Sequence, residues 1–297
     1  MPVGTSQFVG RRLLLILLCL SFPAAAQEIG AITLVEGSLR MIRGTMLFHA
    51  GEGVRLHPGD ILESSSGGFV QLELTGGSVV ALGPSTRLIF LGHGTKTAAE
   101  LVVLSGWLKG ETGANAGTYS YATPQLAATT RGGVVVLEAT REQTSLFVES
   151  GNASISKVSP QGYLTNPQSA TAGQFLTRRD GKNVAVNPRP DQTFLDALPR
   201  AFRDTLPPRL AKFPKAVDPK PDHEVSYAEV QPWLTMALSW RRGFVERFQP
   251  RLKDTEFRQE LDAHIREYPE WDPILHPEKY EPKTSPAAAA SPGETRR

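Results

Sequence analysis

The sequence predicts a mainly β fold, a rolled or solenoid-like stack or a sandwich of many short strands, followed by a smaller α-helical C-terminal region. Three observations predict it. Residues 27–190 contain 23 of the 27 glycines and 25 charged residues, whereas residues 191–282 contain one glycine and 31 charged residues. Turn-forming residues recur about every 8–12 residues in the first part, which is typical of all-β folds. In the second part the hydrophobic residues take helical spacing instead.

The strands are expected from alternation and from glycine-marked turns. Val70, Leu72 and Leu74 alternate with polar residues, as in a half-buried strand. Gly76-Gly77 follows and precedes the apolar run 78–82, so a hairpin or tight corner is expected there. No helical pattern separates the strands, which argues against a parallel α/β sheet. Further β-type runs are Ile32–Val35, Leu88–Leu91, Leu101–Leu104, Val134–Leu137 and Ser145–Val148.

Residues 1–26 have the pattern of a secretory signal peptide. Two arginines precede an apolar core at 13–22, and three alanines supply small side chains before Gln27. The apolar core is about half as long as a membrane-spanning helix must be. We therefore expect export to the periplasm with cleavage before Gln27. A retained signal that tethers the chain to the inner membrane is the alternative.

Charge and cysteine content exclude several classes of function. The chain has 32 basic and 30 acidic residues, and removal of the signal and its two arginines leaves 30 of each. A near-neutral chain without a basic block is not expected to bind nucleic acid. The single cysteine, Cys19, lies within the signal. The mature protein would therefore have neither a disulfide nor a thiol nucleophile.

Proline and composition divide the mature chain. Asn187-Pro188-Arg189-Pro190 cannot continue a helix or a central strand, so it predicts a linker. The proline-rich tail has few hydrophobic residues and is expected to be disordered. The predicted organisation is a signal peptide at 1–26, a β domain at 27–187, a linker at 188–192, a helical region at 193–282 and a disordered tail at 283–297.

Three amphipathic helices are predicted in the helical region. A capping box of Thr193 and Asp196 would start the first, Pro232 would start the second, and Asp254 would cap the third. Helices of this length need a partner surface to bury their apolar faces. These faces would be Leu195, Leu198, Phe202 and Leu206; Trp233, Ala237, Trp240, Phe244 and Phe248; and Phe257, Leu261, Ile265 and Tyr268.

One short phrase occurs three times in the β-rich part. "LVEGSLRMI", "VLSGWLKGE" and "FVESGNASI" each place a glycine between two β-type runs, at Gly37, Gly106 and Gly151. The spacings are unequal, so the phrase does not mark a fixed-period repeat. A glycine there suits a bulge, a corner with positive φ or a close approach of two backbones. We expect a structural corner that turns one strand into the next.

The order of these motifs resembles the FecR family over about residues 29–185. Gly59-Asp60 is followed by strand, Gly-Ser, strand and Pro-Ser segments. Thr123-Pro124 is followed by Arg131-Gly132 and a hydrophobic strand, which is similar to the family pattern. "VEGSLRM", "LVVLSGWLKG", "LFVESGNASIS" and "ATAGQFLTRR" complete the order. Gly133 departs from the pattern, because the family usually has threonine after Arg-Gly.

The resemblance implies a compact, rolled β-structure that works in bacterial envelope signalling. In the best-known members this structure lies in the periplasm and passes a signal from an outer-membrane receptor to a sigma-factor regulator. Those members carry a cytoplasmic helical segment before a transmembrane helix, whereas about a dozen residues precede the apolar run here. We therefore do not expect direct control of a sigma factor. A periplasmic module of the same type remains, with a helical region of unassigned role.

No catalytic, cofactor or metal site is expected, so the protein is predicted not to be an enzyme. The run 83–86, Gly-Pro-Ser-Thr, lacks the second glycine of a nucleophile elbow. His223-Glu224 begins like a zinc-protease helix, but Tyr227 stands where the second histidine must be. Asp60, after Gly59, is expected to cap a turn through nearby backbone N–H groups.

Aromatic residues are the best candidates for recognition. Tyr268, Trp271 and Tyr280 gather in the proline-rich segment "YPEWDPILHPEKY", where they could bind a partner or clamp the tail onto the helices. The leading hypothesis is a non-enzymatic periplasmic FecR-like module that binds an envelope protein in signalling or scaffolding. The alternative is a cell-wall-associated carbohydrate-binding or hydrolytic protein that uses these aromatics on peptidoglycan.

Overall fold

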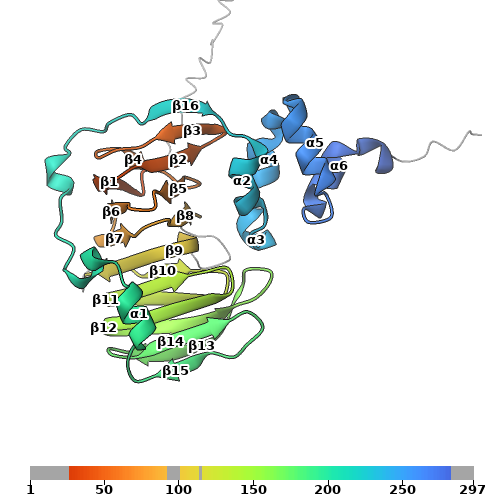
Figure 1. The fold of residues 1–297 in the computed structure, drawn as a ribbon. Coiled ribbons are helices and arrows are strands. Elements are labelled where there is room, and N and C mark those ends of the chain that lie inside the picture. The colour runs from red at the N-terminus through yellow and green to blue at the C-terminus, as the bar shows by residue number, and fades with distance from the viewer. Residues whose placement is uncertain (1–26, 92–100, 114–115, 282–297) are drawn as a thin grey trace, which may run out of the picture.

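The computed structural model describes residues 27–91, 101–113 and 116–281 (Figure 1). Within them it confirms the predicted fold class, because sixteen strands form one many-stranded sheet and a smaller helical region follows. The predicted signal peptide and the predicted tail from residue 283 lie outside the described residues. The strands are β1 (Gly30–Glu36), β2 (Leu39–Arg43), β3 (Met46–His49), β4 (Arg55–Leu56), β5 (Ile61–Ser64), β6 (Phe69–Leu74), β7 (Ser78–Leu82), β8 (Arg87–Phe90), β9 (Leu101–Thr112), β10 (Tyr119–Ala122), β11 (Leu126–Ala139), β12 (Gln143–Val158), β13 (Leu164–Thr171), β14 (Phe175–Arg179), β15 (Ala185–Asn187) and β16 (Lys220–Glu224).

The sheet is rolled into two faces, and three long strands belong to both. The first half of β9 pairs with β8, while its second half pairs with β7. β12 likewise pairs with β14 through residues 143–147 and with β13 through residues 152–158. The first face consists of β1, β4, β6, β7, β14 and β15. The second face consists of β2, β3, β5, β8, β10 and β13. One half of each long strand, β9, β11 and β12, belongs to the first face and the other half to the second.

Glycine permits the bend in each long strand. Gly106 in β9 has φ of 93° and Gly151 in β12 has φ of 74°, values that side chains rarely adopt. Gly151 pairs with Gly133 of β11, and a Cβ atom on Gly151 would lie 2.7 Å from the Gly132 oxygen. Gly37, with φ of 83°, separates β1 from β2. Gly37 therefore links two strands as expected, whereas Gly106 and Gly151 bend a strand that continues.

Apolar side chains fill the space between the two faces. Leu72 and Val80 of the first face and Leu62 and Leu88 of the second are fully buried in one core. This interior layer continues through β9, β11 and β12. Hydrophobic burial between the faces is therefore the main force that holds the stack together, since a chain with a single cysteine cannot form an internal disulfide.

The outer side of the first face is covered by residues 188–226, which we call the strap. Figure 1 shows the strap running along the stack from the end near β14 and β15 to β16, which pairs with β3. Backbone carbonyls of the strap accept hydrogen bonds from polar side chains of the strands. Lys109 Nζ donates to the Phe202 oxygen at 2.9 Å, and Gln71 Nε2 donates to the Pro207 oxygen at 2.8 Å. Both Lys109 and Gln71 are 1% exposed.

Helices cover the outer side of the second face. Ile42, Ile61 and Ile89 of the strands share a core with Trp233 and Phe248 of the helices. The α-helices are α1 (Gln192–Ala197), α2 (Tyr227–Leu234), α3 (Leu238–Arg241), α4 (Phe244–Phe248), α5 (Thr255–Ala263) and α6 (Asp272–Leu275), and the 3-10 turns are Arg200–Arg203, Leu210–Lys212, Gln249–Lys253, Pro269–Trp271 and Pro277–Lys279.

Arg247 fixes α4 to the strands. Its guanidinium donates to the carbonyl oxygens of Ile42 at 3.0 Å, Gly44 at 2.8 Å and Gly59 at 2.7 Å. Burial lowers the pKa of Arg247 to about 10, and the nearby Asp60 carboxylate opposes this change. Because these carbonyls belong to loops and strand ends of the second face, the helical region and the β domain pack as one structure.

The first two predicted helices differ from the observed ones. The first helix ends at Ala197, because Pro199 has no N–H and disfavours helical geometry in the residue before it. Asp191, rather than Thr193, caps it by accepting from the Phe194 N–H. The second run starts at Tyr227 instead of Pro232, after a capping box of Ser226 and Glu229. It is divided among α2, α3 and α4.

The third predicted helix begins where expected. Asp254 caps α5 by accepting from the N–H groups of Glu256 and Phe257. The helix ends at Ala263, before the last two residues of the predicted apolar face, Ile265 and Tyr268.

Candidate functional site

Five neighbouring corners form a row along one edge of the stack, which we call the corner row: Ser38, Ser65, Ser85, Gly106 and Ala139. The Ser38 N–H donates to Ser65 Oγ at 3.2 Å, and the Ser85 N–H donates to the Ser65 oxygen at 2.9 Å. Gly106 packs against the corner that precedes β8 and pairs with Ala139. Since neighbouring strands lie about 4.8 Å apart, the row spans about 19 Å.

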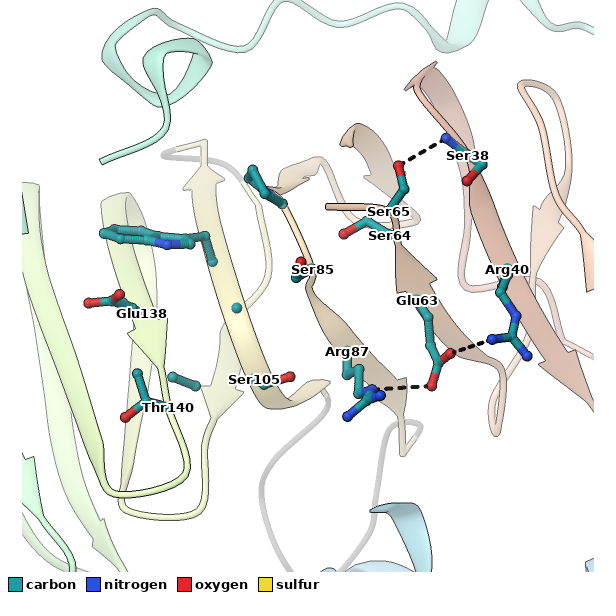
Figure 2. A pocket seen from close by; sticks show the side chains of 14 residues that line it. Ser38, Arg40, Glu63, Ser64, Ser65, Ser85, Arg87, Ser105, Glu138 and Thr140 are labelled. Carbon is teal, nitrogen blue, oxygen red and sulfur yellow. Dashed lines mark hydrogen bonds and ion pairs between the residues drawn. The ribbon is translucent and has the colours of Figure 1, made fainter. Parts of the chain in front are cut away.

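A polar groove of about 710 Å³ follows the corner row. Figure 2 shows its side chains rising from β2, β5, β8, β9 and β11. Six of the fourteen lining residues are serine or threonine, and two more are glycine and alanine, so the backbone of the corners stays accessible. Ser85 is exposed and has φ of 51°, which is uncommon for a residue other than glycine. None of the described residues bonds to the hydroxyls of Ser85 and Ser105.

Two arginines stand on the side of the groove formed by β2, β5 and β8, with Glu63 of β5 between them (Figure 2). Arg40 Nη1 lies 3.7 Å from Glu63 Oε2, and Arg87 Nε lies 3.5 Å from Glu63 Oε1. Arg40 also pairs with Glu229 of α2. The arginine side chains are 38% and 46% exposed, against 14% for Glu63 and 18% for Glu229. The guanidinium groups are therefore more exposed to solvent than their acidic partners.

Glu138 of β11 stands at the opposite end of the groove (Figure 2), and it pairs with Trp107 of β9 in the sheet. No described residue donates a hydrogen bond to the Glu138 carboxylate. Partial burial raises its pKa, and the nearby Asp191 carboxylate raises it further. Trp107 is 8% exposed, because its ring packs at 5.2 Å from the ring of Phe194. The groove therefore exposes two guanidinium groups, each paired with glutamate, on its β2–β5–β8 side and a carboxylate without a described cationic partner on β11.

The helical region and the strap border the groove on opposite sides. Trp233 Nε1 of α2 donates to Glu63 Oε1 at 3.2 Å, so α2 is joined directly to a groove residue. On the other side, Pro199 of the strap packs against Gly83, next to the corner that holds Ser85. The groove thus lies where the β domain, α2 and the strap meet.

The described residues supply binding groups to the groove rather than a reactive set. They contain no cluster of three or more histidine, cysteine, aspartate or glutamate side chains that could hold a metal. The groove offers hydroxyl donors, two guanidinium groups and one weakly acidic carboxylate. Such a set can form hydrogen bonds with a polar ligand.

Residues 60–154 match the family model described as FecR protein. The match spans 95 of the 297 residues, about a third of the chain. The matched residues include the corners at Ser65, Ser85, Gly106 and Ala139 and most of the groove. FecR proteins are regulators associated with the bacterial envelope, so the match supports a role in signalling. No curated protein matches the chain significantly.

Two crystal structures of a candidate anti-sigma factor from Parabacteroides distasonis ATCC 8503, at 2.50 and 1.65 Å, are similar to part of the chain. The sequence identities are 13% and 12%, and both TM-scores are 0.37. Each match covers 46% of this chain and 62% or 63% of the other. The chain thus spans less than two thirds of the length of these proteins.

The glycines and polar residues singled out in the sequence lie at both edges of the stack. Gly37 and Gly106 lie at the groove edge, and Thr123 bonds to Thr144 near it, at 2.7 Å between hydroxyl oxygens. Pro124 follows Thr123 in the same turn. Residues at the opposite edge are Gly59, Asp60, Arg131, Gly132 and Gly151.

Asp60 forms a buried ion pair at that opposite edge. Its carboxylate accepts from the His57 N–H at 2.8 Å, which is the turn-capping contact expected of it. It also accepts two hydrogen bonds from Arg43, at 2.8 and 2.6 Å. Asp60 is 1% exposed, so these contacts hold a turn in place and leave little of the carboxylate for a ligand.

The aromatic candidates do not form a common surface. Tyr268 and Trp271 are both 0% exposed and belong to the core between the helices and the second face. Tyr280 is 57% exposed, and its hydroxyl donates to Asp272 at 2.7 Å. Of the two roles weighed for these rings, their burial fits the clamp and leaves Tyr280 alone accessible to a partner.

Sequence reasoning missed the groove itself. Ser38, Ser85 and Ser105 each lie next to or near a corner glycine, at Gly37, Gly83 and Gly106. A serine beside each glycine corner was the available signal. These serines indicate a common groove only once the strand pairing is known, because the pairing brings the corners into one row.

Proposed function

We propose that this chain is a non-enzymatic, periplasmic binding module of an envelope signalling system, and that it contacts a protein partner through the corner-row groove. The observation that carries the proposal is an open polar groove at the junction of the β domain, α2 and the strap. The FecR match supports the signalling role. The predicted export signal in residues 1–26 supports the periplasmic location.

Binding, rather than catalysis, follows from the chemistry of the groove. Its exposed hydroxyls and guanidinium groups donate hydrogen bonds, but no base contacts a nucleophile among the described groove residues. The alternative use of Tyr268 and Trp271 on peptidoglycan is not favoured, because both rings are buried. In the parts of the chain that the structure describes, no helix has the length and hydropathy needed to cross a bilayer.

Photo-crosslinking in intact cells tests the proposal. A photoreactive amino acid at position 38, an exposed corner position, should capture a defined envelope protein. The same group at position 266, exposed after α5, is the matched control and should not capture that protein. Equal capture from both positions, or none from position 38, would contradict groove binding.

Localisation has a separate test. Mass spectrometry of the chain recovered from the periplasmic fraction should find Gln27 at the N-terminus. An intact Met1 in the membrane fraction would instead support the tethered alternative.

A further inference from the structure

The spacing of the corners along the corner row determines how long a ligand the groove can hold. Each corner contributes a small residue, and four steps between adjacent strands span about 19 Å. An extended polypeptide advances about 3.3 Å per residue, so about six residues would cross the whole row. The exposed Ser85 hydroxyl and the Ser105 hydroxyl can donate to amide carbonyls along such a segment.

The groove fits a polypeptide better than a glycan. Sugar rings are commonly held by stacking on an exposed aromatic face, and the aromatic ring that lines this groove is Trp107. That residue is 8% exposed, and its ring packs against Phe194 and Phe202. The groove therefore provides hydrogen-bond donors without a stacking platform.

The charges give the groove a direction. Arg40 and Arg87 present guanidinium groups on the β2–β5–β8 side, whereas Glu138 is on β11 at the opposite end and has no cationic partner among the described residues. A ligand carboxylate would form charge-assisted hydrogen bonds with the arginines. At the Glu138 end it would meet a carboxylate, so binding in the reverse direction is penalised.

The arginines can bind a ligand without leaving their present places. The contacts of Arg40 Nη1 and Arg87 Nε with Glu63, at 3.7 and 3.5 Å, are longer than a strong charge-assisted hydrogen bond, and the close pair of Arg40 with Glu229 is made through Nη2. Both side chains are more than one third exposed. A carboxylate can therefore approach from solvent while Glu63 stays bonded to Trp233 of α2.

We propose that the groove binds an extended segment of an envelope protein, about six residues long, with an acidic side chain or a C-terminal carboxylate on the side of Arg40 and Arg87. This inference rests on the proposed function and names the chemistry of the partner. The exposed guanidinium pair selects the acid, the corner hydroxyls bind the backbone, and Glu138 sets the direction.

Selection of random octapeptides displayed on phage against the immobilised full chain tests this inference. Enriched peptides should carry Asp or Glu near one end, and synthetic copies should lose at least about tenfold in affinity when that residue becomes Asn or Gln. Arg87→Gln should cause a similar loss. Arg266→Gln, a change at an exposed arginine outside the groove, should leave the affinity unchanged.

Two further measurements complete the test. Glu138→Gln should let the acid appear at either end of the enriched peptides, because it removes the repulsion, and circular dichroism should show that each variant is folded. Enrichment without an acid, acid preference that survives Arg87→Gln, no enrichment, or binding of peptidoglycan fragments alone would each overturn the inference. If position 38 still captures a protein in such a case, the proposed function stands and only the ligand chemistry is wrong.

Discussion

Replacing Gly106 with alanine would place a methyl group inside the neighbouring corner. The added Cβ would lie 2.5 Å from both Cα and Oγ1 of Thr86 and 2.9 Å from the Ser85 oxygen. At φ of 93°, alanine adds about 1–2 kcal/mol of backbone strain. Displacing the packed corner adds about 1–3 kcal/mol. Gly106→Ala should therefore lower the free energy of unfolding by about 2–5 kcal/mol.

Gly44 supplies a matched control for this prediction. It has φ of 60°, and an added Cβ would meet no atom within 4 Å. Gly44→Ala should therefore lose only the strain, about 1–2 kcal/mol. Urea unfolding and thermal unfolding monitored by circular dichroism measure both variants, and each kcal/mol should lower Tm by about 2–4 °C. Equal losses in the two variants would show that contact between the corners is not what requires Gly106.

Three more predictions concern the strap and the helical region. Lys109→Met removes two hydrogen bonds to the strap and the ion pairs with Glu111 and Glu149, so it should lower the free energy of unfolding by about 3–5 kcal/mol. Limited proteolysis of residues 200–210 should become faster. An unchanged proteolysis rate would contradict the role of Lys109 in holding the strap. Hydrogen bonds to Asp222 and Glu229 raise the pKa of His223, so its NMR titration midpoint should lie above about 6.5 and fall in Glu229→Gln. Because the pKa of His223 is higher in the folded than in the unfolded chain, its protonation stabilises the fold. This stabilisation is fully present below about pH 6.5 and is lost as pH rises through the folded pKa. An unchanged His223 midpoint in Glu229→Gln would refute Glu229 as a cause. Trp271→Ala should lose about 3–5 kcal/mol in urea unfolding because the ring is buried, whereas Tyr280→Ala should lose less than about 1 kcal/mol; similar losses would be inconsistent with the clamp.

Alternation and glycine predicted the strands well, because both act locally. Val70, Leu72 and Leu74 face the interior, and the turn at Gly76-Gly77 joins β6 to β7 as expected. The same alternation predicted a solvent-facing side for Gln71, which is in fact buried. The strap covers that side, and a segment more than one hundred residues away leaves no trace in the local pattern.

Helix limits were harder to predict than strands. Asp254 was identified because its side chain caps the N–H groups that follow directly. The first helix was predicted too long because hydrophobic spacing continued past Pro199, whose missing N–H ends the helix. Phe202 and Leu206 still pack against the first face, so the spacing reflected burial rather than helical structure.

The candidate site could be predicted only in part. The corner glycines were found because a repeated phrase marks them. Arg40, Glu63 and Arg87 come from three strands, and no sequence spacing indicates that β5 lies between β2 and β8. The position of Glu229 beside Arg40 depends in addition on where α2 docks.

The strap has a consequence for how the molecule comes apart. Each turn of the stack, with one strand on either face, is one coil. A stack whose coils contact only their neighbours can lose its outermost coil first and then unfold coil by coil. Here one chain segment begins beside the last coil, where Phe194 packs on Phe175 of β14, and finishes at the first coil, where β16 pairs with β3. Neither terminal coil can peel away without pulling on the other, so heating should produce a single cooperative calorimetric transition.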